Sequence, residues 1–574
     1  MWRIKPSPYE DMPESVRDIL VNGLKAYLAS ISKPVLMSMY SMVGSYRIDD
    51  DEITYVTPVF IVDGEDPRAA GLDAVEADST PPRPRALRQR GRTLILDDGG
   101  YARLTIIGRL PGSLPEAFLA LGGLVSEIHV YVEPVRSVRS LLLRARRLRQ
   151  AGHPDWEMLD AILGEATGGH RPLIVRVMLI VRSSDREELE RMHSRIVAYL
   201  AGLGVQYQVP FTGQVALYNK PRRLGMARGV VLTTAAVHVL YFFVAEELME
   251  ENGIPLGVNA RTGAPVVVNP YNRANYNIVI LGESGSGKSM TTKLYVRRWR
   301  TRYEGPVYII DPSGEYARVA ELLDPNLRVH TVSPDRGGLD PVRLYRIGML
   351  TYTQAYEILA SVYGVTEREE KLTLMEQLEN AENVLDVRVL GETKLDAGLF
   401  IGEPPGLDSN GAGVVFDLSR LATSRHKVLA GSILAALLRN RLRRRSLLVV
   451  DEGWLWGQYP ELMALLAEVA RVGRKYGVNF LFATQRPSDV LRNEAGRTIL
   501  EQSATVLLLH LNEASVEAIR DIYMLTEGET QRLLEARPGE GVLRVENWRL
   551  SVYVKPSRRE LEAFSTKPGE WQPL

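Results

Sequence analysis

The sequence predicts an α/β protein with a mainly parallel central sheet in its carboxyl-terminal half, preceded by an α+β domain. Between residues 275 and 554, short strand-like runs alternate with helical stretches, and the runs are apolar at every position. Strands of this kind are buried on both faces, as in a parallel sheet that helices cover on both sides. The runs are Ile278 to Leu281, Val307 to Ile310, Val414 to Phe416, Leu447 to Val450, Phe480 to Ala483 and Val506 to Leu509.

The preceding part of the chain is predicted to hold at least one further domain, because 574 residues are too many for one hydrophobic core. From Thr93 to about Val209, runs of strand type alternate with helical stretches, which is typical of an α+β domain. We expect strands at Thr93 to Leu96, Ala102 to Ile107, Glu127 to Val132 and Leu173 to Val181, and helices at Pro115 to Leu121, Ser137 to Gln150 and Asp185 to Leu203. The predicted regions are an amino-terminal segment and linker over 1–92, the α+β domain over 93–215, a connecting region over 216–270 and the α/β domain over 271–574.

Three segments outside the predicted domains have their own expected structure. Leu20 to Val43 is apolar enough to be helical, whereas Asp78 to Arg92 contains three prolines and five arginines and is typical of a linker or exposed loop. The 17 residues from Gly229 to Ala245 carry no charge, but a membrane-spanning helix needs about 20 mainly apolar residues. We therefore expect a buried helix there.

Composition and charge exclude several kinds of site. Lys+Arg and Asp+Glu both number 70, so any nucleic-acid site has to be a local basic patch. The sequence has no cysteine, which excludes disulfides, thiolate metal sites and cysteine nucleophiles. The absence of cysteine and the preference for Arg over Lys favour a thermophilic source. The short polar start, Met1 to Pro8, is followed by no apolar signal-peptide core, so we expect a protein of the cytoplasmic side.

A glycine-rich segment predicts a nucleotide site. Residues 282–289, Gly-Glu-Ser-Gly-Ser-Gly-Lys-Ser, match the pattern G-x-x-x-x-G-K-[ST] between an apolar strand and a helix. In such a loop the backbone N–H groups surround the phosphates of ATP, the lysine reaches the β and γ phosphates, and the serine hydroxyl binds Mg²⁺. The residues expected to bind ATP are Gly282, Glu283, Ser284, Gly285, Ser286, Gly287, Lys288, Ser289 and Met290.

Two acidic residues at the end of another apolar strand predict the second half of this site. Asp451 and Glu452 follow the run Leu447 to Val450. Asp451 is placed to hold Mg²⁺ together with Ser289, and Glu452 to activate the attacking water as a general base. The alternative is a buried strand that ends in a solvated acidic pair.

Polar residues near the next strand add candidates for catalysis. Gln485 follows Phe480 to Ala483 and is expected to bond the attacking water or the γ-phosphate, or else to cap the next turn. Arg474 is the first candidate for an arginine finger that reaches a neighbouring subunit, and Arg486 is the second. Cations near Arg474 also suit the negative end of a helix. Asp311 is expected either to shape the site or to cap the helix that follows it.

Together these segments resemble the HerA/FtsK superfamily of ring-forming motors, and above all its conjugation branch, the CagE/TrbE/VirB-type ATPases of type IV secretion. The matching motifs of the α/β domain are Asp311 to Tyr316, Gly473 to Gly477, Ala483 to Asp489 and Pro538 to Glu540. Gly100 to Leu104, Val130 to Pro134 and Gly253 to Gly257 are similar to the amino-terminal pattern of the conjugation branch, which HerA and FtsK motors do not normally share.

The resemblance implies a RecA-like P-loop core that hydrolyses ATP with Mg²⁺ in a homohexamer. It also implies a cytoplasmic protein at the inner face of the membrane, which contacts membrane components of a DNA-transfer or secretion channel and powers DNA transfer or pilus assembly. An archaeal version fits the composition. Two alternatives stay open: a HerA-like DNA translocase in DNA end processing, and a nucleotide-binding scaffold without turnover.

Two groups of arginines are candidate phosphate-binding patches. For the first group a solvated helix face is the favoured interpretation, and for the second the negative end of a helix explains most of the charge. Their members are Arg136, Arg139, Arg144, Arg146, Arg147 and Arg149 in the first group, and Arg439, Arg441, Arg443, Arg444 and Arg445 in the second.

Overall fold

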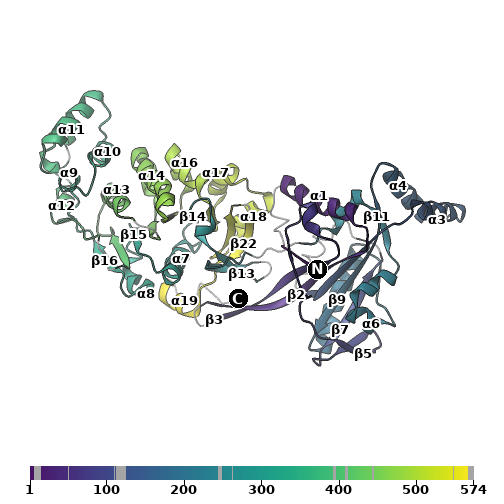
Figure 1. The fold of residues 1–574 in the computed structure, drawn as a ribbon. Coiled ribbons are helices and arrows are strands. Elements are labelled where there is room, and N and C mark those ends of the chain that lie inside the picture. The colour runs from purple at the N-terminus through teal and green to yellow at the C-terminus, as the bar shows by residue number, and fades with distance from the viewer. Residues whose placement is uncertain are drawn as a thin grey trace. The chain divides into compact units, whose positions relative to one another are not determined.

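The computed structural model forms two compact units (Figure 1). The first comprises Met1–Tyr46, Thr54–Glu247 and Thr262–Ala264, and the second comprises Arg47–Ile53, Leu248–Arg261 and Pro265–Leu574. The structure describes the whole chain except residues 6–13, 49–50, 109, 111–123, 244–247, 261–262, 392, 394–395, 408–410, 443–444, 547 and 566–574. The predicted helix from Pro115 to Leu121 lies outside the described residues.

The first unit is built on an 11-stranded sheet of order β4-β1-β3-β2-β8-β9-β7-β6-β5, with β10 beside β7 and β11 beside β9. Every strand pair whose register is described here is antiparallel. Its elements are β1 (Trp2–Ile4), α1 (Glu14–Ser30), β2 (Val35–Ile48), β3 (Asp51–Asp63), η2 (Pro67–Ala70), β4 (Ala74–Glu76), β5 (Ala86–Arg90), β6 (Thr93–Leu96), β7 (Tyr101–Ile107), β8 (Glu127–Pro134), α3 (Val138–Gln150), α4 (Asp155–Thr167), β9 (Pro172–Ser183), α5 (Arg186–Gly202), β10 (Tyr207–Gln208), α6 (Gln214–Asn219), η4 (Pro221–Met226), β11 (Val230–Thr233) and η5 (Thr234–Leu240). The strands predicted between residues 93 and 181 are thus present as β6 to β9, and two of the predicted helices are present as α3 and α5.

Two of the other local predictions are wrong. The helix expected over Leu20 to Val43 stops at Ser30, because Pro34 cannot continue a helix, and the following residues pair with β8 as β2. The described residues 229–243 do not form one long helix: the β-branched first part forms β11 against β9, and the short 3-10 helix η5 follows. Within the predicted linker, residues 86–90 form β5. The arginines of the first group are all exposed around α3.

A buried charge network fixes β8 in the first unit. Glu127 is fully buried and accepts hydrogen bonds from His129 Nε2 at 2.9 Å and Arg83 Nη1 at 2.5 Å, and Arg182 lies 3.4 Å from its other oxygen. Ser38 pairs with the second ring nitrogen of His129 at 2.8 Å. Burial alone would raise the pKa of Glu127, but His129 and the two arginines lower it overall.

The second unit is an α/β domain, as predicted, and its 11-stranded sheet is mixed. The order is β13-β12-β22-β21-β20-β14-β19-β18-β15-β17-β16. The strands from β20 to β16 in this order pair parallel, and the other described pairs are antiparallel.

The elements of the second unit follow one another in strand-and-helix alternation. They are β12 (Ile254–Asn259), β13 (Pro265–Val268), η6 (Pro270–Asn272), β14 (Asn277–Leu281), α7 (Lys288–Tyr303), β15 (Val307–Asp311), η7 (Ala317–Val319), α8 (Ala320–Leu323), β16 (Arg328–Thr331), α9 (Pro341–Arg346), α10 (Tyr352–Val362), α11 (Arg368–Asn380), η8 (Val384–Asp386), η9 (Arg388–Leu390), α12 (Ala397–Phe400), β17 (Gly413–Asp417), α13 (Ser424–Arg441), β18 (Leu447–Val450), η11 (Gly453–Gln458), α14 (Pro460–Tyr476), β19 (Asn479–Thr484), α15 (Pro487–Val490), α16 (Glu494–Gln502), β20 (Thr505–Leu508), α17 (Glu513–Tyr523), α18 (Glu527–Glu535), β21 (Glu540–Val545), β22 (Trp548–Tyr553) and α19 (Arg558–Phe564).

Both faces of the parallel strands are buried, which explains why their sequences are apolar throughout. Ile278 and Ile280 of β14 pack in one core with Trp299 of α7, whereas Val279 and Leu281 pack in another core that includes residues of α13 and α14. Helices therefore cover each face (Figure 1). Among the described residues, no helix is both long enough and apolar enough to cross a membrane.

We predict that Glu127→Ala lowers the free energy of unfolding of the first unit by about 3–5 kcal/mol, because it leaves the two half-buried arginines without the buried carboxylate that they share. In a thermal unfolding experiment, this loss appears as a lower midpoint temperature of the transition in which the first unit unfolds. Glu187→Ala, at an exposed carboxylate of α5, is the matched control. A midpoint that moves equally little in both variants would show that the network does not stabilise the unit.

Candidate nucleotide-binding and catalytic site

The glycine-rich loop joins the central strand β14 to α7 with backbone conformations that favour glycine. Gly285 and Gly287 have φ values of 84° and 93°. A Cβ atom on Gly282 would lie 2.4 Å from the Ser286 hydroxyl oxygen, so a side chain there would force at least this hydroxyl out of its position. Gly287 precedes α7 and no side chain caps the helix. The first N–H groups of α7 are therefore free of a side-chain cap, as a phosphate site requires.

An unsatisfied polar atom inside the loop agrees with phosphate binding. The hydroxyl of Ser286 is buried, yet it has no hydrogen-bond partner among the described residues. A buried polar group without a partner is costly, and a phosphate oxygen would satisfy it. Ser289 is half-buried, whereas the side chain of Met290, the third residue of α7, packs in the core, so only the backbone of Met290 could contact a nucleotide. Glu283 instead accepts the backbone N–H of Asn512 at 3.0 Å.

The lysine of the loop contacts both predicted carboxylates. Lys288 Nζ donates to Asp451 Oδ1 at 2.7 Å and to Glu452 Oε1 at 3.3 Å. Only 5% of the Lys288 side chain and 1% of the Asp451 side chain are exposed. Burial alone would lower the pKa of Lys288, but the two carboxylates raise it above its usual range, so the lysine is protonated.

Strand order explains why residues so far apart in sequence meet here. β19 lies between β14 and β18, and all three run parallel. The loop after β14, the acidic pair after β18 and Gln485 after β19 therefore emerge at one edge of the sheet. Ligand sites of open α/β sheets lie at this carboxyl edge.

Glu452 is held in an unusual backbone conformation by a set of side-chain contacts. Its φ of 53° and ψ of 43° lie in the left-handed region, which residues other than glycine rarely adopt. Glu452 Oε2 accepts the Trp454 indole N–H at 2.6 Å and Gln485 Nε2 at 3.0 Å. Strained backbone that the surroundings hold in place is concentrated at functional sites. Glu452 keeps 19% of its side chain exposed and can be reached by solvent.

Trp454 is a site residue that the sequence analysis missed. It lies in η11 directly after the acidic pair, and the Arg486 guanidinium lies 4.7 Å from the centre of its ring. Arg486 also lies 4.0 Å from Asp489. An aromatic residue two positions after Glu452 was the available signal, but a contact of this kind depends on the turn of η11, which the sequence does not specify.

Of the remaining predicted residues, Asp311 lies near enough to Asp451 for their charges to interact, and the side chain of Arg474 is outside the described residues. Asp311 is fully buried and accepts the backbone N–H groups of Gly314 and Tyr316, each at 2.8 Å, so it organises the turn after β15. Burial raises the pKa of Asp311 and the nearby charge of Asp451 adds to this rise, while the backbone N–H groups of Ala317 and Tyr316 act in the opposite direction. Arg474 belongs to α14, but its side chain is outside the described residues.

Comparison with known proteins identifies part of the second unit. Residues 254–396 match the family model described as the central domain of helicase HerA. No curated protein matches the sequence. Among solved structures, VirB4 of Thermoanaerobacter pseudethanolicus matches with a TM-score of 0.47 and 23% identity over 55% of this chain and 100% of that chain. The bacterial conjugative coupling protein TrwB matches with a TM-score of 0.39 and 12% identity over 54% of this chain and 90% of that chain.

The HerA match begins at β12, includes the whole glycine-rich loop and ends in the helices after β16. It therefore contains Lys288 but neither Asp451 nor Gln485. This match confirms, over residues 254–396, the resemblance to the HerA/FtsK superfamily that the motifs predicted.

Proposed function

We propose that the chain hydrolyses ATP and is the motor subunit of a conjugation-type machine that moves DNA or assembles a pilus. The observation that carries the ATPase proposal is the double contact of Lys288 with Asp451 and Glu452. In this arrangement the cation contacts both a candidate metal ligand and a candidate base at the carboxyl edge of the sheet.

The residues around this point fit a magnesium nucleotide. Ser289 and Asp451 would hold the Mg²⁺ ion, and the loop N–H groups with the Ser286 hydroxyl would bind phosphate oxygens. When bound, Mg²⁺ offsets the negative charge of the phosphates. Lys288 would exchange its carboxylate partners for the β and γ phosphates, which frees Glu452 from its cation.

Glu452 is the proposed general base. Its carboxylate takes a proton from water as the water oxygen bonds to the γ-phosphorus, and the bond from that phosphorus to the oxygen of ADP breaks. Gln485 and Trp454 hold one oxygen of Glu452, which leaves the other oxygen, the one that now faces Lys288, to accept the proton. Glu452 contacts Trp454, and Trp454 contacts Arg486. A movement of the γ-phosphate that shifts Glu452 would therefore also shift Trp454 and Arg486.

The proposed motor role rests on the sequence motifs of both units. The match to the HerA central domain supports a ring-forming motor, and the motifs Gly100 to Leu104 and Val130 to Pro134 favour the conjugation branch. These two segments lie on β7 and β8 of the first unit. Such a motor would be a homohexamer on the cytoplasmic side, bound to the membrane through partners. The HerA match itself favours the second candidate, a DNA translocase in end processing.

We predict that Glu452→Gln retains ATP binding and reduces steady-state ATP hydrolysis by at least about 100-fold, because an amide cannot take the proton. Phosphate release and equilibrium binding of labelled ATP measure the two effects. Glu321→Gln, at an exposed carboxylate of α8, is the control. Unchanged turnover in Glu452→Gln would remove this residue from the mechanism. If the unsubstituted chain also binds ATP without hydrolysing it, the result would support a nucleotide-binding scaffold.

Trp454→Phe is predicted to lower kcat about tenfold with little change in KM, because the ring stays while the indole N–H that orients Glu452 is lost. Steady-state kinetics as a function of ATP concentration separate the two constants. A rise in KM at constant kcat would instead show that Trp454 contributes to ATP binding.

A subunit-mixing experiment tests the ring. If Arg474 acts on the nucleotide of a neighbouring subunit, Arg474→Ala and Lys288→Ala chains, each inactive alone, regain part of the ATPase activity when mixed. In a mixed ring some sites combine an intact loop with an intact arginine. Absence of recovery at every mixing ratio would argue against Arg474 as the finger.

A further inference from the structure

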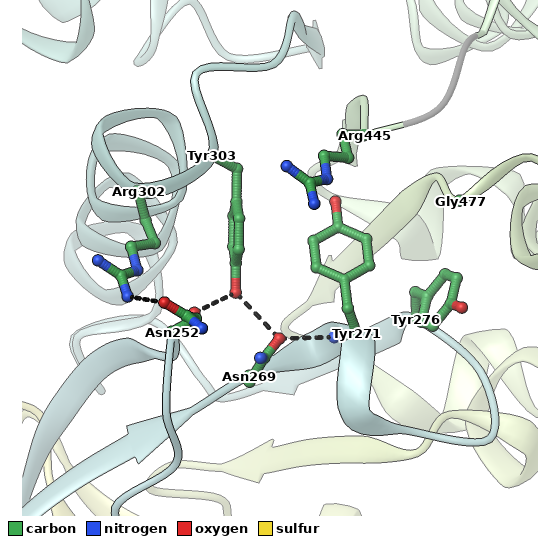
Figure 2. A pocket seen from close by; sticks show the side chains of 8 residues that line it. All are labelled: Asn252, Asn269, Tyr271, Tyr276, Arg302, Tyr303, Arg445 and Gly477. Atoms are coloured by element: carbon green, nitrogen blue, oxygen red, sulfur yellow. Dashed lines mark hydrogen bonds between the residues drawn. The ribbon is translucent and has the colours of Figure 1, made fainter.

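A second polar cavity lies at the opposite edge of the parallel strands. It has a volume of about 560 Å³, within the range of roughly 300–1,000 Å³ that is common for small-molecule sites. All of its residues belong to the second unit (Figure 2). They are Asn252, Asn269, Tyr271, Tyr276, Arg302, Tyr303, Arg445 and Gly477.

The cavity is distinct from the proposed ATP site. Tyr276 directly precedes β14, and Arg445 and Gly477 come just before β18 and β19. The five residues of β14 separate the two edges by about 16 Å, at about 3.3 Å per residue. β14, β18 and β19 nevertheless carry groups of both sites, and α7 runs from Lys288 to Tyr303.

Three tyrosines form an aromatic wall in the cavity. The rings of Tyr271 and Tyr303 lie 4.9 Å apart at 89°, and those of Tyr271 and Tyr276 lie 5.1 Å apart at 61°. Hydrogen bonds fix the wall: the Tyr303 hydroxyl donates to the Asn252 carbonyl at 2.9 Å and contacts Asn269 Oδ1 at 3.1 Å. Ordered aromatic rings of this kind present faces and edges against which a planar base can pack.

Two arginines give the cavity a positive charge. Within the described part of the chain, neither Arg302 nor Arg445 forms an ion pair, and the polar partner of Arg302 is the neutral Asn252 at 2.5 Å. Glu250, the carboxylate that acts on Tyr303 from nearby, is paired with Arg273 at 2.5 Å. A phosphate in the cavity would therefore meet two available guanidinium groups.

A buried hydroxyl lies beside these cations. The Tyr271 hydroxyl oxygen is buried and forms no hydrogen bond of standard geometry among the described residues, although the buried Trp299 indole N–H lies close to it. Because an indole N–H can only donate, the hydrogen of the Tyr271 hydroxyl stays available. In Figure 2 it points toward the side of the cavity where Arg445 lies, and Arg445 acts electrostatically on both Tyr271 and Tyr303. Burial raises the pKa of Tyr271, so its hydroxyl is protonated and can donate to an anion.

We propose that this cavity is a second nucleotide-binding site, which takes a nucleoside phosphate with its base against the tyrosine wall and its phosphate on Arg445, Arg302 and the Tyr271 hydroxyl. The same chemistry is offered by a free nucleotide and by one unit of single-stranded DNA. Both contain a planar base joined to an anionic phosphate, which is the combination that the wall and the two arginines recognise.

The test uses the full chain with Lys288→Ala, so that the result does not depend on ATP turnover at the glycine-rich loop. Fluorescence anisotropy measures the binding of labelled ADP in one arm and of a labelled thymidine oligonucleotide in the other. Arg445→Glu and Tyr276→Ala are added to this chain one at a time. Arg328→Glu is the matched control, because Arg328 is an exposed arginine at the amino end of another parallel strand, β16.

We expect at least one probe to bind, and Arg445→Glu and Tyr276→Ala each to weaken that binding by about tenfold or more, while Arg328→Glu changes it little. Tyr276→Phe should restore binding, since it keeps the ring. The arm that responds identifies free nucleotide or single-stranded DNA as the source. Binding of neither probe, or equal effects of the Arg445 and Arg328 substitutions, would overturn the proposal.

Discussion

The contact between Lys288 and the acidic pair after β18 is the interaction on which the candidate site depends. A buried ammonium group needs counter-charges, and Asp451 and Glu452 supply them at 2.7 Å and 3.3 Å. The contact draws together the ends of two strands that are not neighbours in the sheet. It also keeps the glycine-rich loop beside the acidic pair before any phosphate has bound.

The parallel sheet makes this contact possible. Because β14, β19 and β18 run in one direction, their carboxyl ends meet at one edge and their amino ends at the other. One edge gathers the loop, the acidic pair and Gln485, and the other gathers tyrosines and arginines around a cavity. The same strands therefore place two different sets of polar groups at their two ends.

Much of this site could be predicted from sequence because its parts are local. A strand, a glycine-rich turn and a helix specify the loop around Lys288 by themselves, and an apolar run that ends in two acids specifies the place of Asp451. The contact of Glu452 with Trp454 could not be predicted, since it depends on a left-handed residue and on the turn of η11. The tyrosine wall could not be predicted either, because its residues come from three segments: Tyr271 from η6, Tyr276 from the position before β14, and Tyr303 from the end of α7.

The amino-terminal part shows the other limit of sequence reasoning. Residues 35–43 are as apolar as a buried helix, and their pairing with β8 is what makes them a strand. Arg83, in the proline-rich segment, reaches the buried Glu127 of β8, a contact between residues 44 positions apart. Tertiary pairing of this kind decides between helix, strand and loop where local signals conflict.

The most direct test of the account is an experimental structure of the full chain with Mg²⁺ and a non-hydrolysable ATP analogue. We expect the Lys288 ammonium to leave Asp451 for the phosphates, Mg²⁺ to lie between the Ser289 hydroxyl and Asp451, and Glu452 to keep its bonds to Trp454 and Gln485. An analogue bound elsewhere, with the pair of Lys288 and Asp451 intact, would contradict it.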